Sequence, residues 1–322
     1  ALQDFFGGIQ EVATNPSFLP ARQEALSTAE SLASRFQSLA GRLDEIEQGV
    51  NSQIMSSVSI INTYAEQIAS LNDAIGKAQR ATGQPPNDLL DMRDQLVLDL
   101  NKEIKATVVK QGDDGYNVFI GNGQPLVVGG STYKLSNMAS PTDPSKVEVA
   151  YQTSGGDLVL IGESGLAGGK LGGLIEFRSK TLEPAQNALG RVAIGLASTF
   201  NAQHTAGFDL NGDPGTAFFT VAAPLVTANS NNDTASTAVI GATISDVSAL
   251  TTSDYRLAYD GSTSSYTLTR LSDNTTFSPV TSGRTVDVVT ITLSGTPAAG
   301  DSFRILPTVN DASGVSVAIT YP

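Results

Sequence analysis

The sequence contains no cysteine and no tryptophan, and it has a single histidine. The absence of cysteine excludes disulfides, thiolate chemistry and cysteine metal sites. With a single histidine, a site with two histidine ligands is impossible, and any Ser-His-Asp triad would have to use His204. We therefore expect a protein that is not an enzyme and that holds no metal and no cofactor.

Basic residues are scarce as well. The chain of 322 residues has 19 lysines and arginines against 32 aspartates and glutamates, which gives a formal net charge of -13. An acidic surface repels a phosphate backbone, so nucleic acid is not an expected partner. The sequence has no run of about eighteen apolar residues, so no membrane partner is expected. Its start, ALQDFFGG, lacks the basic and then apolar order of a secretory signal.

Apolar residues recur at alternating steps of three and four through the first third of the chain. One run extends from Ala29 to Val50 and a second from Ile54 to Leu71. This spacing predicts a helix over residues 17–81, which at about 1.5 Å per residue would be on the order of 90 Å long. Such a stripe must be covered, so the chain either folds back on itself or associates with another copy. A break near residue 49, a glycine, is the alternative to one continuous helix.

Two further helices are predicted. The segment 82–86 ends the first helix, and a helix that begins at Asn87 or Asp88 returns antiparallel along it. A later helix begins at about Leu171. Pro184 predicts a kink or a restart in this helix, because proline removes an interior N–H and clashes with the preceding turn.

Alternation with a period of two predicts β-strands in two other parts of the chain. In the first part the predicted strands are 107–110, 116–120, 125–128, 146–151 and 158–161. The loop 111–115 joins the first two of them. In the last part the predicted strands are 255–259, 266–268, 286–293 and 303–306. The stretch 227–237, rich in asparagine and threonine, is predicted to be a linker or a long surface loop.

These patterns predict an α+β fold, with a long antiparallel helical rod similar to a coiled-coil bundle, an inserted β region and a C-terminal antiparallel β domain. The predicted segments are the first part of the rod (1–106), the inserted β region (107–167), the returning helix and loop (168–220) and the β domain (221–322). Large apolar residues on the helix faces are expected to carry the packing of the rod or its assembly. They are Leu32, Phe36, Leu39, Leu43, Ile46, Leu96, Leu100, Leu189, Val192 and Leu196.

Two loops invite comparison with ligand-binding motifs, and neither fits. The segment 209–215 places oxygen ligands at alternate positions like a calcium loop, but Pro214 stands where the sharp-turn glycine belongs and Thr220 where a glutamate belongs. A turn is the simpler interpretation, and a looser cation site is the alternative. The glycine-rich segment 164–171 fails as a phosphate-binding loop, because it lacks the first glycine and the hydroxyl residue after the lysine.

The remaining candidates for chemistry are one histidine and a set of acids. His204 stands at the end of a predicted helix, where an interaction with the helix dipole is the simplest account. Asp88, Asp91 and Asp94 recur at steps of three at a helix start, where carboxylates complement the dipole and cap free N–H groups. Hydrolysis by two carboxylates is the catalytic class that stays open as an alternative.

Six short segments carry distinctive sequences. They are NDLLDMRDQL at 87–96, GGKLGGLIEFR at 168–178, LGRVA at 189–193, FNAQH at 200–204, GFDLNG at 207–212 and GTPAAGDSF at 295–303. In this order they resemble the flagellar hook-associated protein 1 family, the hook-filament junction proteins. The resemblance extends over nearly all of the chain.

This resemblance implies a structural protein of the bacterial flagellum, without catalysis, that acts in motility and forms a ring between hook and filament. It implies an extracellular location, reached through the flagellar type III export apparatus without a cleaved signal peptide. The implied partners are other copies of the chain, the hook protein, a second junction protein and an export chaperone.

Family members carry amphipathic helical segments at both extreme termini, and neither is recognised in this sequence. The chain is therefore expected to be a core fragment without the C-terminal segment that would contact the chaperone. The alternative function is a surface adhesin or carbohydrate-binding module that uses the β domains.

Overall fold

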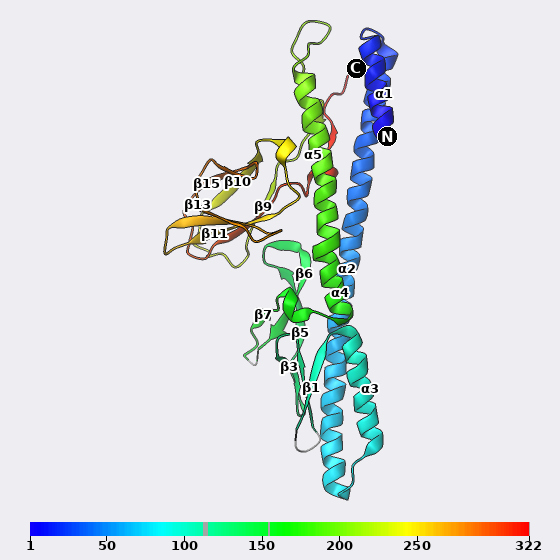
Figure 1. Ribbon diagram of the computed structural model, residues 1–322, viewed down its shortest axis with the longest axis vertical. Helices are drawn as coiled ribbons and strands as arrows, with labels where there is room; N and C mark the ends of the chain where they lie inside the picture. Colours follow the sequence, from blue (N-terminus) through cyan, green and yellow to red (C-terminus); the bar gives the residue numbers. More distant parts are fainter. Residues whose placement is uncertain (112–114, 154, 322) are drawn as a thin grey trace. The chain divides into compact units, whose positions relative to one another are not determined.

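The computed structural model describes residues 1–111, 115–153 and 155–321, which form two compact units (Figure 1). Unit 1 comprises Ala1–Glu45, Pro141–Asp143 and Leu182–Pro322, and unit 2 comprises Ile46–Ser140 and Pro144–Thr181. Each unit combines helices with β-strands, as the predicted α+β class requires. The four-segment division expected from the sequence groups the chain differently, and its boundaries stay a prediction.

The longest element is helix α2, Leu19–Thr82, with 64 residues. At about 1.5 Å per residue it extends over roughly 96 Å. The alternative of a break near Gly49 is excluded, because α2 is continuous there and an added Cβ on this glycine would contact nothing within 4 Å. A glycine on an open helix face lowers helix propensity by only about 1 kcal/mol. Buried Val50 and Ile54, 4% and 0% exposed, flank this position and hold the helix in place.

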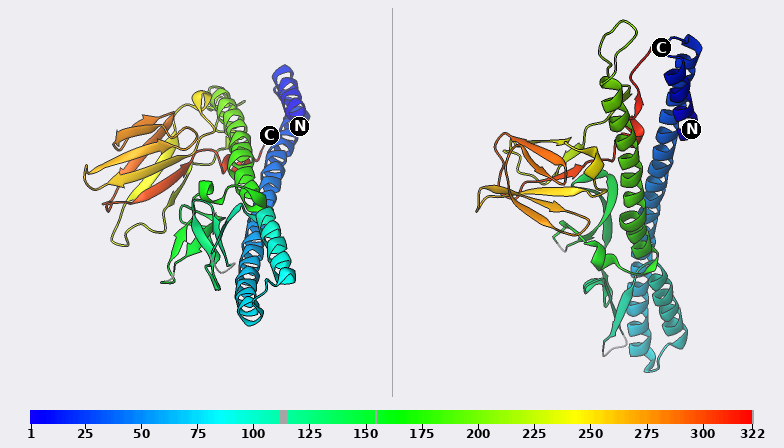
Figure 2. Two further views of the ribbon diagram at one scale, coloured as in Figure 1. Left: turned by 60° about the horizontal axis from the view of Figure 1, so that its bottom comes forward. Right: turned by 45° about the horizontal axis from the view of Figure 1, so that its top comes forward.

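Helix α1, Leu2–Thr14, precedes α2 and was not among the predicted elements. It folds back beside the start of α2, and both views in Figure 2 show this pairing. Phe5 is fully buried, and Gly8 approaches the backbone of Ala25 so closely that an added Cβ would lie 3.1 Å from its Cα. The small residues of α1 therefore allow the two helices to pack closely.

Helix α5, Glu183–Thr205, runs beside the first part of α2 in unit 1 (Figures 1 and 2). Pro184 stands in its first turn, after a π-helical turn at Arg178–Leu182 that follows helix α4, Gly169–Phe177. The backbone stays helical from α4 through this π-helical turn into α5, so Pro184 follows a change of helix type and not a non-helical break.

The C-terminal β domain of unit 1 contains a five-stranded sheet in the order β13-β12-β11-β16-β9 and a three-stranded sheet in the order β10-β15-β14. The strands are β9 Leu225–Ala228, β10 Val239–Ile244, β11 Tyr255–Asp260, β12 Ser265–Arg270, β13 Thr276–Val280, β14 Arg284–Val286, β15 Val289–Ser294 and β16 Ser302–Leu306. Alternate residues of both sheets form one core, in which Leu257, Leu268, Ile291 and Ile305 are fully buried. The pair β8, Phe219–Thr220, and β17, Ser316–Val317, lies outside these sheets.

One sequence prediction for this domain is wrong, and another has a boundary that differs by two residues. The predicted strand 286–293 is a hairpin, because Asp287 and Val288 adopt φ values of 45° and 68° and turn the chain between β14 and β15. Primed hairpin turns require positive φ, and a β-branched residue rarely adopts it. The predicted linker or loop 227–237 is irregular over 229–237, and only its first two residues belong to β9, which pairs with β16.

Unit 2 combines the second part of α2 with helix α3, Asn87–Glu103, which returns beside it, and with α4 (Figure 1). One sheet has the order β1-β2-β3-β4 and another the order β5-β6-β7. The strands are β1 Ala106–Lys110, β2 Tyr116–Ile120, β3 Gln124–Val128, β4 Ser131–Thr132, β5 Leu135–Ser140, β6 Asp143–Gln152 and β7 Leu158–Leu160. The predicted hairpin β1–β2 is present, and residues 112–114 of its loop lie outside the described residues.

One apolar core joins the helices and sheets of unit 2. Ile61 and Ile68 of α2 and Leu100 of α3 are fully buried against Val118 and Val127 of the sheet. Sequence periodicity in helices and strands thus converges on the same core.

Among the described residues, none of the helices is both long enough and apolar enough to cross a membrane.

Candidate functional site

The apolar seam between α1, α2 and α5 is the centre of unit 1. Leu32 and Phe36, two of the predicted packing residues, are 5% and 8% exposed. Leu189 and Leu196 of α5 are half-buried against the same core, which also contains Phe5. Five rings meet at one end of this seam, where Phe5, Phe200, Phe218 and Phe219 contact one another and His204 stacks on Phe200. Aromatic rings held edge to face add stability beyond their buried area.

Val192 and Ile46 do not have the buried positions that helical packing predicts. Their side chains are 57% and 45% exposed, whereas Leu39 and Leu43 are half-buried. The face that α5 buries consists mainly of small residues, Gly190, Ala193 and Ala197 among them. Small side chains let two helices approach closely, and a search for large apolar residues selects the neighbouring stripe instead. A role of Val192 and Ile46 in assembly stays a prediction.

The difference in exposure between Phe36 and Val192 predicts that the two side chains contribute differently to stability. Phe36→Ala is expected to lower the free energy of unfolding by about 3 to 5 kcal/mol, because it leaves a cavity between helices. Val192→Ala, the matched control on an exposed face, is expected to change it by less than about 0.5 kcal/mol. Urea unfolding followed by circular dichroism measures both. Equal losses for the two variants would contradict the assignment of the buried face.

In unit 2, the predicted residue Leu100 is fully buried and Leu96 is half-buried against the same core. Next to this core, the start of α4 lies close to the end of α3, in a part of the sequence that is rich in glycine. Gly169, with φ of 66°, begins α4 so close to the end of α3 that an added Cβ would lie 2.6 Å from the backbone carbon of Glu103. The glycine-rich segment 164–171 therefore serves a close backbone approach, which accounts for its composition without a phosphate ligand.

Three asparagines of α2 fasten the β-strands of unit 2 to the helix. Asn62 donates from Nδ2 to the carbonyl of Leu135 and accepts from the N–H of the same residue, both at 2.9 Å. Asn51 donates to the carbonyl of Ser145 at 2.8 Å and accepts from the N–H of Val147 at 3.1 Å. In each case the side-chain amide pairs with a strand backbone as a neighbouring strand would.

The third asparagine, Asn72, is the most completely bonded. Its Nδ2 donates to the carbonyls of Tyr116 and Gly129, both at 2.8 Å, and its Oδ1 accepts from the N–H of Tyr116 at 3.0 Å. The Nη1 of Arg93 also donates to this oxygen at 3.0 Å, and the guanidinium lies over the ring of Tyr116. Arg93 is 1% exposed. The helix and the sheet are thus joined by the buried amide of Asn72, both ends of which are hydrogen-bonded.

The hydrogen bonds of Asn62 predict that removing its side chain destabilises unit 2. Asn62→Ala leaves the N–H and C=O of Leu135 without their helix partner, and it is expected to destabilise unit 2 by about 1 to 3 kcal/mol. Thr63→Ala, one residue further along the same helix and exposed, is expected to change stability by less than about 0.5 kcal/mol. Hydrogen exchange at the amide of Leu135 should accelerate in the first variant only. Unchanged exchange in Asn62→Ala would contradict the role of the amide.

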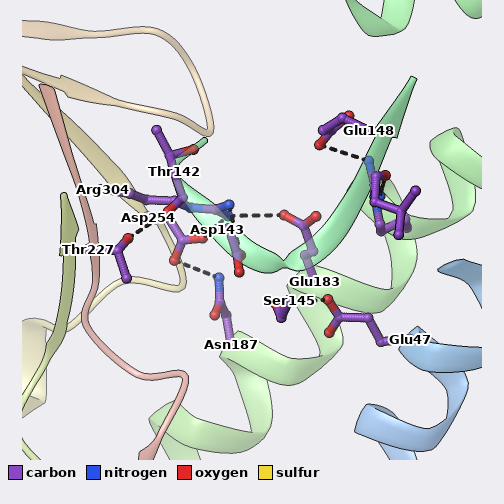
Figure 3. A network of polar contacts seen from close by, with 12 residues as sticks. Glu47, Thr142, Asp143, Ser145, Glu148, Glu183, Asn187, Thr227, Asp254 and Arg304 are labelled. Atoms are coloured by element: carbon purple, nitrogen blue, oxygen red, sulfur yellow. Dashed lines mark hydrogen bonds and ion pairs between the residues drawn. The ribbon is translucent and has the colours of Figure 1, made fainter. Parts of the chain in front are cut away.

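A second polar centre lies in unit 1, around Arg304 of β16. Figure 3 shows its guanidinium among three carboxylates, at distances of 2.9 Å from Asp254, 3.2 Å from Asp143 and 3.4 Å from Glu183. Arg304 is 12% exposed, and the carboxylates are 8%, 14% and 22% exposed in the same order. The planar guanidinium has enough donors for several oxygens at once, which lysine lacks. We call these residues, with Asn187, the Arg304 cluster.

The Arg304 cluster connects the β domain to α5. Burial alone would lower the pKa of Arg304, but the charges of Asp254, Glu183 and Asp143 outweigh it and raise the pKa. Asn187 of α5 donates to Asp254 at 3.1 Å, so the acid is held from both sides. The charges therefore stay paired in a poorly hydrated place, where an unpaired charge would be costly.

Two of the residues singled out for chemistry, His204 and Asp209, have structural partners. The Nδ1 of His204, in the last turn of α5, lies 2.7 Å from the carbonyl oxygen of Thr216. Asp209 accepts from the N–H groups of Asn211 and Asp213, both at 2.8 Å, and hydrogen bonds from Asp213 and Asn211 lower its pKa. The segment 209–215 is thus a turn closed by a carboxylate. In the described ranges no three histidine or acidic side chains come together to hold a metal ion.

Sequence reasoning did not find the three asparagines or the Arg304 cluster. The asparagines had a signal, since each is a polar residue next to the apolar stripe of a helix, at steps of eleven and ten residues along α2. The Arg304 cluster had none, because its charged residues come from parts of the chain as far apart as 143, 183, 254 and 304.

A helix of 64 residues, to which polar side chains fasten β-strands, defines an α+β protein built on a long helix. Comparison with protein families identifies the family. Residues 1–219 match the model of the helical domain of flagellar hook-associated protein FlgK, and residues 227–307 match the model of a D2-like domain of flagellar hook-associated protein 1. The chain belongs to the flagellar hook-associated protein 1 family.

Similar proteins share both sequence and fold with this chain. Flagellar hook-associated protein 1 of Escherichia coli strain K12 is 39% identical over 323 residues, and that of Salmonella typhimurium is 37% identical over 324 residues. Each comparison covers 99% of this chain and 58% of the relative. The flagellar hook junction protein FlgK of Burkholderia pseudomallei has a solved structure that superposes with a TM-score of 0.90 at 40% identity, over 99% of this chain and 58% of that one. The chain therefore spans somewhat more than half the length of these relatives.

Proposed function

We propose that this chain is part of a structural subunit of the bacterial flagellum, an adaptor at the junction between hook and filament. The observation that carries this proposal is the match of 99% of the chain to a solved hook junction protein with a TM-score of 0.90. The two family models support it, because they cover both the helical part and the C-terminal β domain. The alternative of an adhesin gains no support from these comparisons.

The physical features suit a part that transmits force. A continuous helix of 64 residues resists bending, and its three asparagines hold the strands of unit 2 against it. In unit 1 the Arg304 cluster holds the β domain to α5. A subunit that turns with a flagellum needs such fixed joints, since a β domain that swings freely on its helix would not pass on torque. The proposed work is mechanical, and no catalytic step is assigned to it.

The location and the partners follow from the same proposal. The subunit would stand outside the cell, exported through the flagellar type III apparatus without a cleaved signal. It would contact other copies of itself in a ring, the hook protein and a second junction protein. Exposed Ile46 and Val192 are available for contacts between subunits. A contact with the export chaperone would belong to a part of the longer relatives outside this match.

Complementation tests the proposal. The full-length gene that contains this chain is expressed in a strain that lacks its own hook-filament junction protein, and filaments are counted by electron microscopy. The expected result is that filaments return on hooks that were bare, while the empty vector leaves the hooks bare. Hooks that stay bare although the protein is exported in normal amounts would refute the proposal.

A further inference from the structure

The last described segment of the chain closes the core of unit 1. Helix α6, Asp311–Gly314, is followed by β17, which pairs with β8. Ala312 and Val315 are 2% and 4% exposed in the same core as Phe36. The Nε2 of Gln37 in α2 donates to the carbonyl of Val315 at 2.9 Å. We call residues 311–319 the closing segment.

The first residue of the closing segment is a buried acid without a partner. Asp311 is 3% exposed, and within the described residues neither of its carboxylate oxygens has a hydrogen-bond partner. Other buried acids of the chain are bonded: Asp254 pairs with Arg304, and Asp301 accepts from the N–H groups of Asp233 and Ala298. A carboxyl group in such surroundings favours its neutral form.

Among the described residues, no neighbouring charge offsets the burial of Asp311. On α5, Glu183 pairs with Arg304, exposed Arg191 donates to a backbone carbonyl, and His204 lies against another. On α2 the guanidinium of Arg35 is exposed, α1 carries acidic residues but no basic ones, and β8 has no charged residue. Burial is accordingly the cause that raises the pKa of Asp311, to about 7.

We propose that Asp311 is a proton-operated latch, whose neutral form lets the closing segment pack on the helices of unit 1 and whose ionised form releases it. The released segment would expose Ala312 and Val315 and free the edge of β8. The latch is separate from the proposed function, because it needs only the contacts of Asp311 and its core.

The direction of the pH dependence follows from proton binding. In the closed segment the pKa of Asp311 is about 7, and in the open segment it returns toward 3.8. The closed state therefore binds more protons between these values, so its stability falls as the pH rises through this range and levels off above it. Between pH 5 and pH 8 the opening constant should increase roughly 80-fold.

Hydrogen exchange tests the latch in the intact chain. The exchange rates of the amides of residues 312–319, divided by their intrinsic rates, give the opening constant. This constant should increase roughly 80-fold between pH 5 and pH 8. Asp311→Asn removes the ionisable group and should make the opening independent of pH. Asp301→Asn, at a buried acid whose hydrogen bonds are made, is the matched control and should keep the pH dependence.

If Asp311→Asn does not fold, the titration of Asp311 in the unmodified chain is the second test. The carboxyl carbon of Asp311 in the unmodified chain is followed by NMR as a function of pH. A midpoint near 7 supports the latch. A midpoint near 4, or an unchanged pH dependence of exchange in Asp311→Asn, overturns it.

Discussion

Replacing Arg304 by alanine is expected to destabilise unit 1 by about 3 to 5 kcal/mol, because it leaves three carboxylates close together without their cation. The acids involved, Asp143, Glu183 and Asp254, are each less than a quarter exposed, so water cannot compensate for the lost pairing. Chemical unfolding followed by circular dichroism measures the loss. The β domain should also detach from α5 locally, which limited proteolysis would detect.

The control for Arg304→Ala is a pair of similar geometry on the surface. Lys180 and Glu176 of unit 2 lie 2.8 Å apart, with both side chains more than half exposed. Lys180→Ala is expected to leave stability nearly unchanged, because both charges are solvated. Adding Asp254→Asn to Arg304→Ala should restore part of the stability, since it removes one uncompensated charge. A loss of less than about 1 kcal/mol in Arg304→Ala would show that the cluster does not hold the domain.

Gly190→Ala is expected to destabilise unit 1 by about 3 kcal/mol or more, because overpacking against a fixed backbone cannot be relieved by a rotamer change. An added Cβ at Gly190 would overlap the carbonyl oxygen of Thr308, so α5 and the segment before α6 would have to separate. Thermal unfolding followed by circular dichroism measures the loss.

Gly195, on the same helix, is the matched control. An added Cβ there meets nothing within 4 Å, so Gly195→Ala should stabilise the helix by up to about 1 kcal/mol through its propensity alone. Opposite signs for two identical substitutions on one helix are the expected result. The same sign for both would mean that α5 and Thr308 are not in close contact.

Regular patterns made the helices and most strands predictable. The apolar steps from Ala29 to Leu71 follow the period of α2 throughout, and one glycine on an exposed face does not interrupt a helix whose other face is buried. An irregularity in the helix near Pro184 was likewise predictable, because proline has few compatible positions in a helix. These features depend on local chemistry, which the sequence displays directly.

Features that depend on distant residues or on small side chains were not predictable. The turn at Val288 has a positive φ that no β-branched residue favours, so only the pairing of β14 with β15 explains it. The buried stripe of α5 uses Gly190 and Ala193, whose small size weakens the apolar signal. The ionic contacts of Arg304 join residues that only the folded chain brings together.

The predicted packing residues show the same difference between what local patterns predict and what they do not. Leu32, Phe36 and Leu100 follow the helical period and are buried, whereas Val192 follows it and is exposed. Periodicity places apolar residues on one face of a helix, but it does not show which part of that face contacts the partner helix. On α5 that part is occupied by Gly190, Ala193 and Ala197, and Val192 beside them stays exposed.

The most direct test of the account is the place of the protein in the flagellum. Flagella from a strain that expresses the full-length protein are labelled with an antibody against the C-terminal β domain and gold particles, and examined by electron microscopy. Gold is expected to be confined to a narrow band where the hook meets the filament. Gold spread along the filament or over the cell surface would contradict it.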